Sequence, residues 1–140
     1  MPSLDFTHEH DYRAGPDDHS PEVQIRIFPK GIGSVPVAIT AVLDSGASVS
    51  MFDKSLLGLF GIADIATGQK GEVRTANNEI ADAFVHNLDI EFLGRQMTIP
   101  VMFSPVWPDG TPNLLGMKGF FEQLLIAFKH QERAALVAFI

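Results

Sequence analysis

The 140 residues include 10 basic and 17 acidic side chains and no cysteine, and the formal net charge is −7. The lack of cysteine excludes disulfide scaffolds, thiolate metal sites and cysteine nucleophiles. The acidic balance argues against nucleic acid as a partner, because binding to phosphate draws on clustered Lys and Arg. An apolar share of 46% is sufficient for the core of one domain.

The start of the chain differs from the rest in composition. Residues 1–21 are rich in acidic side chains, His and Pro, and we interpret them as a flexible polar leader that precedes one domain at 22–140. The three His of this leader are interpreted as solvated rather than as metal ligands. We find neither a signal peptide nor an apolar run near the ~20 residues of a membrane span, so we expect a cytoplasmic protein with no membrane partner.

From Glu22 onward, apolar and polar residues alternate in short runs, which is the period of half-buried strands. The second run is apolar on both faces, so we expect it to lie inside a sheet. Short strands with turns between them and only brief helices indicate an all-β fold. The predicted strands are 22–27, 35–43, 72–75, the run ending at Phe92, 97–103, 126–128 and 134–140, and the predicted helices are 53–57 and 117–124.

Asp44 is the side chain with the clearest chemical potential. It follows the apolar pair Val42-Leu43 and precedes Ser45-Gly46-Ala47. A carboxylate that emerges from a buried strand costs free energy unless it is hydrogen-bonded or has a function. Gly46 lets the backbone approach this carboxylate, so that its amide can donate to it. The alternative interpretation is a strand-ending turn with a self-bonding Asp.

Residues 42–48, Val-Leu-Asp-Ser-Gly-Ala-Ser, resemble the catalytic loop of the retropepsin-like aspartic peptidases. Two further matches follow in the family's order. Ala76-Asn77-Asn78, between two strands, resembles the flap hairpin that closes over substrate. Leu114-Leu115-Gly116 resembles the element that braces the catalytic loop, and residues 136–140 stand where the family builds its dimer interface. The resemblance spans about 22–140.

This resemblance implies a closed, barrel-like all-β fold with a flap hairpin, assembled as a homodimer. The implied enzyme is an aspartic endopeptidase without metal or cofactor, which hydrolyses peptide bonds in a peptide or protein substrate. Aspartic proteolysis needs two carboxylates that share a proton and a water, and this chain offers one such loop. The second carboxylate therefore has to come from a second copy of the chain. The implied roles are catalytic for Asp44, loop support for Ser45, Gly46, Ala47, Leu114, Leu115 and Gly116, and substrate binding by the flap residues Ala76, Asn77 and Asn78.

Ala47 has no hydroxyl to favour the ionised carboxylate, so we expect activity at mildly acidic to near-neutral pH.

Lys118 stands where many relatives carry an acidic or amide residue. The alternative function is a catalytically silent dimerisation or peptide-binding module. We expect apolar substrate pockets built partly from Ile80 and Val106.

Four other carboxylates could pair with Asp44 within one chain: Asp53, Asp82, Asp89 and Glu91. Asp53 is expected to cap a helix, and Asp82 is the strongest candidate of the four.

Overall fold

The computed structural model describes residues 4–13, 20–29, 35–74 and 77–140. Within these ranges the chain is mainly β, and its helices are short 3-10 turns, which confirms the predicted all-β class. The strands are β1 His8–Asp11, β2 Glu22–Ile27, β3 Val37–Leu43, β4 Ser50–Met51, β5 Gln69–Arg74, β6 Ile80–Phe92, β7 Arg95–Phe103, β8 Leu114–Leu115, β9 Leu124–Lys129 and β10 Ala134–Phe139. The 3-10 helices are η1 Lys54–Phe60, η2 Ile65–Thr67, η3 Phe121–Gln123 and η4 His130–Glu132.

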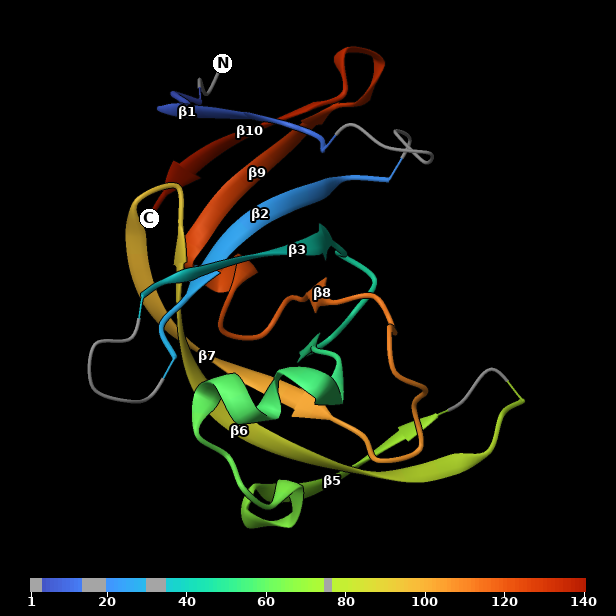
Figure 1. Ribbon diagram of the computed structural model, residues 1–140. Helices are drawn as coiled ribbons and strands as arrows, with labels where there is room; N and C mark the ends of the chain where they lie inside the picture. Colours follow the sequence, from blue (N-terminus) through green and yellow to red (C-terminus); the bar gives the residue numbers. More distant parts are fainter. Residues whose placement is uncertain (1–3, 14–19, 30–34, 75–76) are drawn as a thin grey trace.

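The larger sheet has the strand order β2-β3-β8-β4-β7-β6-β5 (Figure 1). An additional antiparallel pairing joins β2 to β6, so the strands from β2 to β6 form a closed ring. Strand β3 lies between β2 and β8, which confirms that it is an interior strand. Alternate residues of the antiparallel strands face the core, whose largest fully buried side chains include Phe52, Phe92, Phe103 and Phe120.

A second sheet, in the order β1-β10-β9, is formed by the two ends of the described chain. The expectation of a flexible leader is therefore wrong for residues 8–11, because these residues pair with β10 as strand β1. Tyr12 follows β1 and is only 7% exposed, and burial raises the pKa of its phenol more than Arg133 lowers it. The sequence of β1 is polar at every position, so it has no apolar alternation that would predict a strand. Its pairing comes from backbone hydrogen bonds to β10.

The two predicted helices are both present in altered form. The first is η1, which begins after the expected cap Asp53 and continues beyond the predicted end to Phe60. Gly61 caps its C-terminal end with a left-handed φ of 72°. The second is reduced to η3, because Gly119 adopts a left-handed φ of 79°, which a right-handed helix cannot include. Within the described ranges, no helix has the length and apolar content needed to cross a bilayer.

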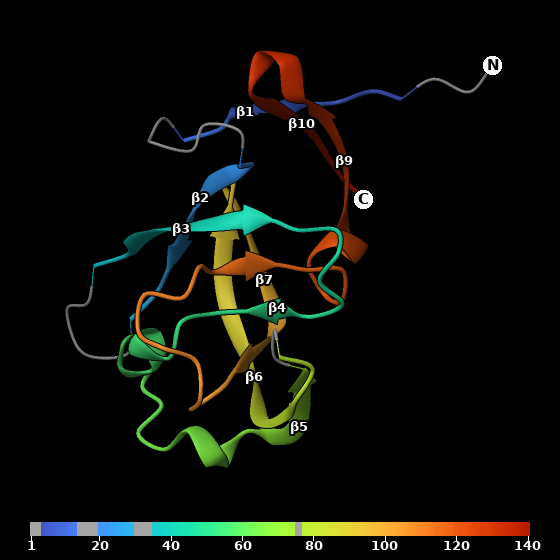
Figure 2. The same ribbon diagram turned by 90° about the vertical axis from the view of Figure 1, so that its right-hand side faces the viewer.

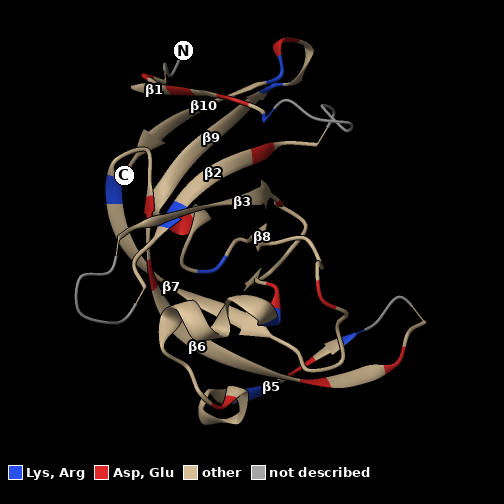
Figure 3. Cartoon of the chain, viewed as in Figure 1, with Lys and Arg blue, Asp and Glu red and all other residues tan. Residues whose placement is uncertain are grey.

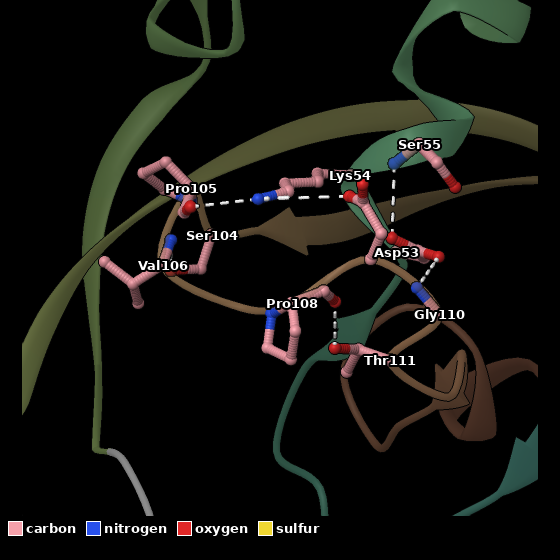
Figure 4. A network of polar contacts seen from close by, with 10 residues as sticks. Asp53, Lys54, Ser55, Ser104, Pro105, Val106, Pro108, Gly110 and Thr111 are labelled. Atoms are coloured by element: carbon pink, nitrogen blue, oxygen red, sulfur yellow. Dashed lines mark hydrogen bonds and ion pairs between the residues drawn. The ribbon is translucent and has the colours of Figure 1, made fainter.

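Asp53 connects η1 to the proline-rich loop at 104–113 (Figure 4). Its carboxylate accepts hydrogen bonds from the Ser55 amide at 3.2 Å and the Gly110 amide at 2.8 Å. The Asp53 amide donates to Asn113 Oδ1, and Asn113 Nδ2 donates to the carbonyl of Thr40 in β3. Burial raises the pKa of Asp53, but the bonds from Gly110 and Ser55 outweigh burial and hold the pKa below its ordinary value.

We expect Asp53→Ala to lower the free energy of unfolding at pH 7 by about 1 kcal/mol, the usual cost of losing a helix cap. A carboxyl whose pKa is lowered by folding stabilises the fold above its ordinary value of 3.8, and this contribution is lost as pH falls through the folded pKa. The difference between Asp53→Ala and the unmodified protein should therefore shrink below pH 3.8. Urea unfolding at neutral and acidic pH measures both effects.

Asp109→Ala is the matched control, because Asp109 belongs to the same loop, lies 3.9 Å from Lys54 and has a side chain 78% exposed. An exposed ion pair of this kind is worth at most about 1 kcal/mol and is often not measurable. Equal stability of the two variants at pH 7 would contradict the role given to Asp53.

Candidate active site

Asp44 lies directly after β3, in a turn held by backbone hydrogen bonds. Its amide donates to the carbonyl of Leu115 at 2.9 Å, and the Ala47 amide donates to the carbonyl of Asp44 at 3.1 Å. The Gly46 amide donates to Asp44 Oδ1 at 2.8 Å, which is the contact that the sequence predicts. A Cβ at position 46 would lie 3.1 Å from the same oxygen, so a side chain there would crowd the carboxylate. Asp44 itself is half-buried, and Ser45 is exposed.

Strand β8 and the residues that follow it brace this turn. β3 and β8 pair in parallel, with Val42 opposite Leu114 and Leu43 opposite Leu115. Beyond β8, the Met117 amide donates to the carbonyl of Ala47 at 2.9 Å. These contacts place the Leu-Leu-Gly element against the Asp44 turn, the arrangement implied by the resemblance.

Gly116 is the point of closest approach in this brace. Its amide donates to the buried hydroxyl of Ser50 at 2.9 Å. A Cβ at position 116 would lie 2.7 Å from the carbonyl carbon of Val49 and 2.8 Å from the carbonyl oxygen of Ala47. Both atoms belong to the backbone, so a residue other than glycine requires the turn to move.

A hollow of about 490 Å³ opens beside the Asp44 carboxylate. One wall is the turn itself, and another is the end of β5. The floor and sides include apolar side chains from β4, β7 and β8. The lining residues are Asp44, Gly46, Ala47, Ser48, Val49, Met51, Glu72, Val73, Arg74, Met102 and Leu114.

β5 and β6 form the hairpin that the sequence predicts (Figure 1). Arg74 pairs with Ile80 at its outer end, and Arg74 Nη1 donates to Asn78 Oδ1 at 3.0 Å. Asn78 adopts a φ of 63°, a conformation that Asn tolerates better than most residues. Of the predicted flap residues, Asn77 and Asn78 lie in this hairpin, and Ala76 lies outside the described residues.

The structure separates the other candidate residues from Asp44. Ile80 and Val106 are exposed and do not line the hollow, so the structure does not support their assignment to its pockets. The competing carboxylates also have other contacts: Asp53 with Gly110, Asp82 with Lys70 at 3.7 Å, Asp89 with the Thr98 hydroxyl, and Glu91 with Arg26 at 3.2 Å.

Glu72 is the additional carboxylate that lines the hollow, and the sequence did not single it out. It lies in β5 opposite Asp82 of β6. The available signal was its position in the strand leading to the predicted flap. Alternation within that strand does not say which of its residues face the Asp44 turn, because this depends on how the hairpin crosses the sheet.

No protein-family model matches the sequence, and comparison with curated proteins finds no match either. Among solved structures, the fold is similar to that of a retropepsin-like aspartic protease from Rickettsia conorii. The TM-score is 0.62 at 19% sequence identity, and the match covers 94% of this chain and 99% of the other. The chain therefore has the retropepsin-like fold, and the resemblance drawn from its motifs is confirmed at the level of the fold.

We expect Gly116→Ala to lower the free energy of unfolding by about 1–3 kcal/mol, the usual cost of overpacking, because its Cβ meets backbone atoms of the turn. Gly58→Ala is the matched control, since no atom lies within 4 Å of a Cβ at that exposed position in η1. Gly58→Ala should not lower stability and is expected to raise it by about 0.5–1 kcal/mol, because Ala is favoured over Gly within a helix. Chemical denaturation of both variants measures the difference, and equal effects would show that the brace is not tight at Gly116.

Proposed function

We propose that this chain is an aspartic endopeptidase whose active form contains two copies. The observation that carries the proposal is the Asp44 carboxylate, fixed by the Gly46 amide at 2.8 Å and facing a hollow walled by the flap-side strand β5. The similarity of the fold to an aspartic protease is consistent with this chemistry. The acidic carboxylate, the open hollow and the adjoining hairpin together favour hydrolysis of an extended peptide.

The mechanism needs one carboxylate as base and a second as acid. Asp53, Asp82, Asp89 and Glu91 contact other partners. The sequence offers one Asp-Ser-Gly turn, so we assign the second role to Asp44 of a second copy. The Gly46 amide holds Oδ1, and Oδ2 then carries or accepts the shared proton. One carboxylate takes a proton from the bound water as the water attacks the peptide carbonyl, while the other gives its proton to the carbonyl oxygen. In the breakdown of the resulting tetrahedral diol, the carboxyl group that took the water proton gives it to the amide nitrogen, and the other carboxylate takes a proton from a diol hydroxyl. The C–N bond then breaks, and the amine and the new carboxylic acid leave without an acyl-enzyme.

The substrate lies, in this proposal, between the Asp44 turn and strand β5. A peptide in extended conformation can form backbone hydrogen bonds with a neighbouring strand, and side chains on alternate sides enter pockets. Met51, Met102 and Leu114 supply apolar surface for such a side chain. Glu72 and Arg74 add one charge of each sign at the flap side of the hollow.

Asp44→Asn tests the assignment of the catalytic carboxylate. We expect peptide hydrolysis to fall by about 10²–10⁴-fold or more, because the amide cannot exchange the proton that general acid–base catalysis requires. The readout is cleavage of an unstructured protein substrate, with and without a statine-type inhibitor. Circular dichroism and sedimentation should show an unchanged fold and assembly.

Asp82→Asn is the matched control, because Asp82 is an exposed carboxylate in the flap-side strand β6 and pairs with Lys70. This variant should retain its activity. Full activity of Asp44→Asn would show that the proposal is wrong. A protein that binds the peptide without cleaving it would instead be the silent peptide-binding module.

The pH dependence of cleavage tests the role of Ala47. Without a hydroxyl at this position, we expect activity to be greatest at mildly acidic to near-neutral pH. Ala47→Ser adds a hydroxyl that can donate to the carboxylate and favour its ionised form, so the profile should shift toward lower pH. A pH–rate series on both proteins measures the shift, and an optimum near pH 2 in the unmodified protein would contradict the expectation.

A further inference from the structure

Strand β5 has little apolar support from its own side chains. It is the last strand of the larger sheet, and among the described strands it pairs only with β6. Its half-buried residues are Gly71 and Val73, and the others are exposed. Figure 3 shows charges of both signs along this strand. Because so little apolar surface is buried, the position of β5 depends on its backbone pairing and on the contacts at its two ends.

His86 lies on the inward face of the neighbouring strand β6. Alternate residues of a strand share a face, and residue 86 shares that of the buried Leu88 and Ile90. Its ring meets that of the fully buried Phe103 nearly edge-on, with the centroids 5.9 Å apart. A polar side chain at such a position costs free energy unless it is hydrogen-bonded, so its partner indicates its role.

The partner of His86 is the backbone carbonyl of Ile65, in η2. His86 Nε2 lies 2.8 Å from this oxygen. A carbonyl only accepts, so the bond requires a proton on Nε2. The same oxygen accepts the Gly68 amide at 3.3 Å, which is the bond that closes η2. β5 begins at the next residue, Gln69, so His86 holds the turn from which β5 starts.

Gly68 makes this contact possible. A Cβ at position 68 would lie 2.5 Å from His86 Nε2 and 2.7 Å from the carbonyl oxygen of Val85. Gly68 has a φ of −75°, which any residue can adopt, so its backbone conformation does not require glycine. The close approach of the imidazole ring to the backbone is what requires it.

The start of β5 is connected to the hollow beside Asp44 through the strand itself. In Figure 1 the short coil of η2 lies at the start of β5, at the opposite end from the hairpin tip, and Figure 2 shows the same coil leading into β5. The other end of β5, at Glu72, Val73 and Arg74, lines the hollow. The strand is six residues long, so a shift at its start moves this wall.

We propose that His86 is a positioning residue for the hollow: its bond to the Ile65 carbonyl fixes the start of β5 and thereby the wall that β5 contributes. The inference rests on the proposed function only in taking the hollow as the substrate site. Without the bond, the start of β5 opens more often, and a peptide binds only to the fraction of molecules in which the strand is in place. The bond therefore acts on substrate affinity rather than on the reaction at Asp44.

Hydrogen exchange of the backbone amides measures this opening directly and needs no activity. His86→Leu removes the donor but keeps most of the bulk, whereas His86→Gln keeps an N–H donor of similar reach. Exchange of the amides at 69–74 should be about fivefold faster in His86→Leu, which is the effect of one lost hydrogen bond on a local opening. In His86→Gln the exchange should return to that of the unmodified protein, and a failure to return would overturn the proposal.

Ile99→Val is the matched control for a general loss of stability. Ile99 is fully buried in β7 opposite Leu88, two positions along β6 from His86. Its truncation weakens the core without removing the bond to η2, so it should not accelerate exchange at 69–74 selectively. Equal acceleration in β5 and β7 in His86→Leu would show a merely structural role and would overturn the proposal.

The kinetics of peptide cleavage supply a second readout. KM should rise about fivefold in His86→Leu with kcat unchanged, and His86→Gln should restore KM. A fall in kcat at unchanged KM would contradict the assignment, because it would place the effect on the chemical step.

The two readouts separate this inference from the proposed activity. If His86→Leu selectively accelerates exchange in β5 and the unmodified protein cleaves no peptide, the positioning of β5 by His86 stands and the enzymatic proposal fails. If the protein cleaves peptide and exchange in β5 is the same in all variants, the activity stands and the role of His86 is overturned.

Discussion

The arrangement of this protein depends on the backbone contact between the turn after β3 and the segment that follows β8. Gly116 makes the contact possible, because its missing side chain lets the carbonyl of Ala47 and the backbone of Val49 approach. The Asp44 amide is bound to Leu115 and its carboxylate to Gly46, so the acidic group is held by the main chain. A carboxylate held in this way keeps its position without relying on flexible side chains.

The same contact is connected to two parts of the molecule, the hollow beside Asp44 and strand β9. On one side, the turn lines the hollow that the end of β5 also lines. On the other side, Met117 is bonded to Ala47 of the turn and to Glu122 of η3, and η3 leads into the outer strand β9. The hollow and the start of β9 are therefore connected to the same contact, and a shift of Gly116 would move both.

Local pattern was sufficient for much of this structure. The alternation in β2 and β7 predicts strands because each buries one face, and Asp44-Ser45-Gly46 predicts a turn in which the Gly46 amide meets the carboxylate. The parts that pattern missed depend on partners distant in sequence. β1 has a wholly polar sequence and exists through its pairing with β10, and β4 is a two-residue strand defined by its pairing with β7 and β8. The helix expected at 117–124 is shortened because the chain turns at Gly119, whose φ of 79° is left-handed.

The placement of the charges distinguishes the two outer strands of the terminal sheet. An outer strand with unpaired backbone groups invites aggregation unless charge or another feature protects it. β1 and β9 are the outer strands of the same sheet, yet Glu9 and Asp11 are on one and the uncharged run from Leu124 to Phe128 is on the other. β1 therefore has a second consequence beyond stabilising β10: it protects one edge of the sheet with charge.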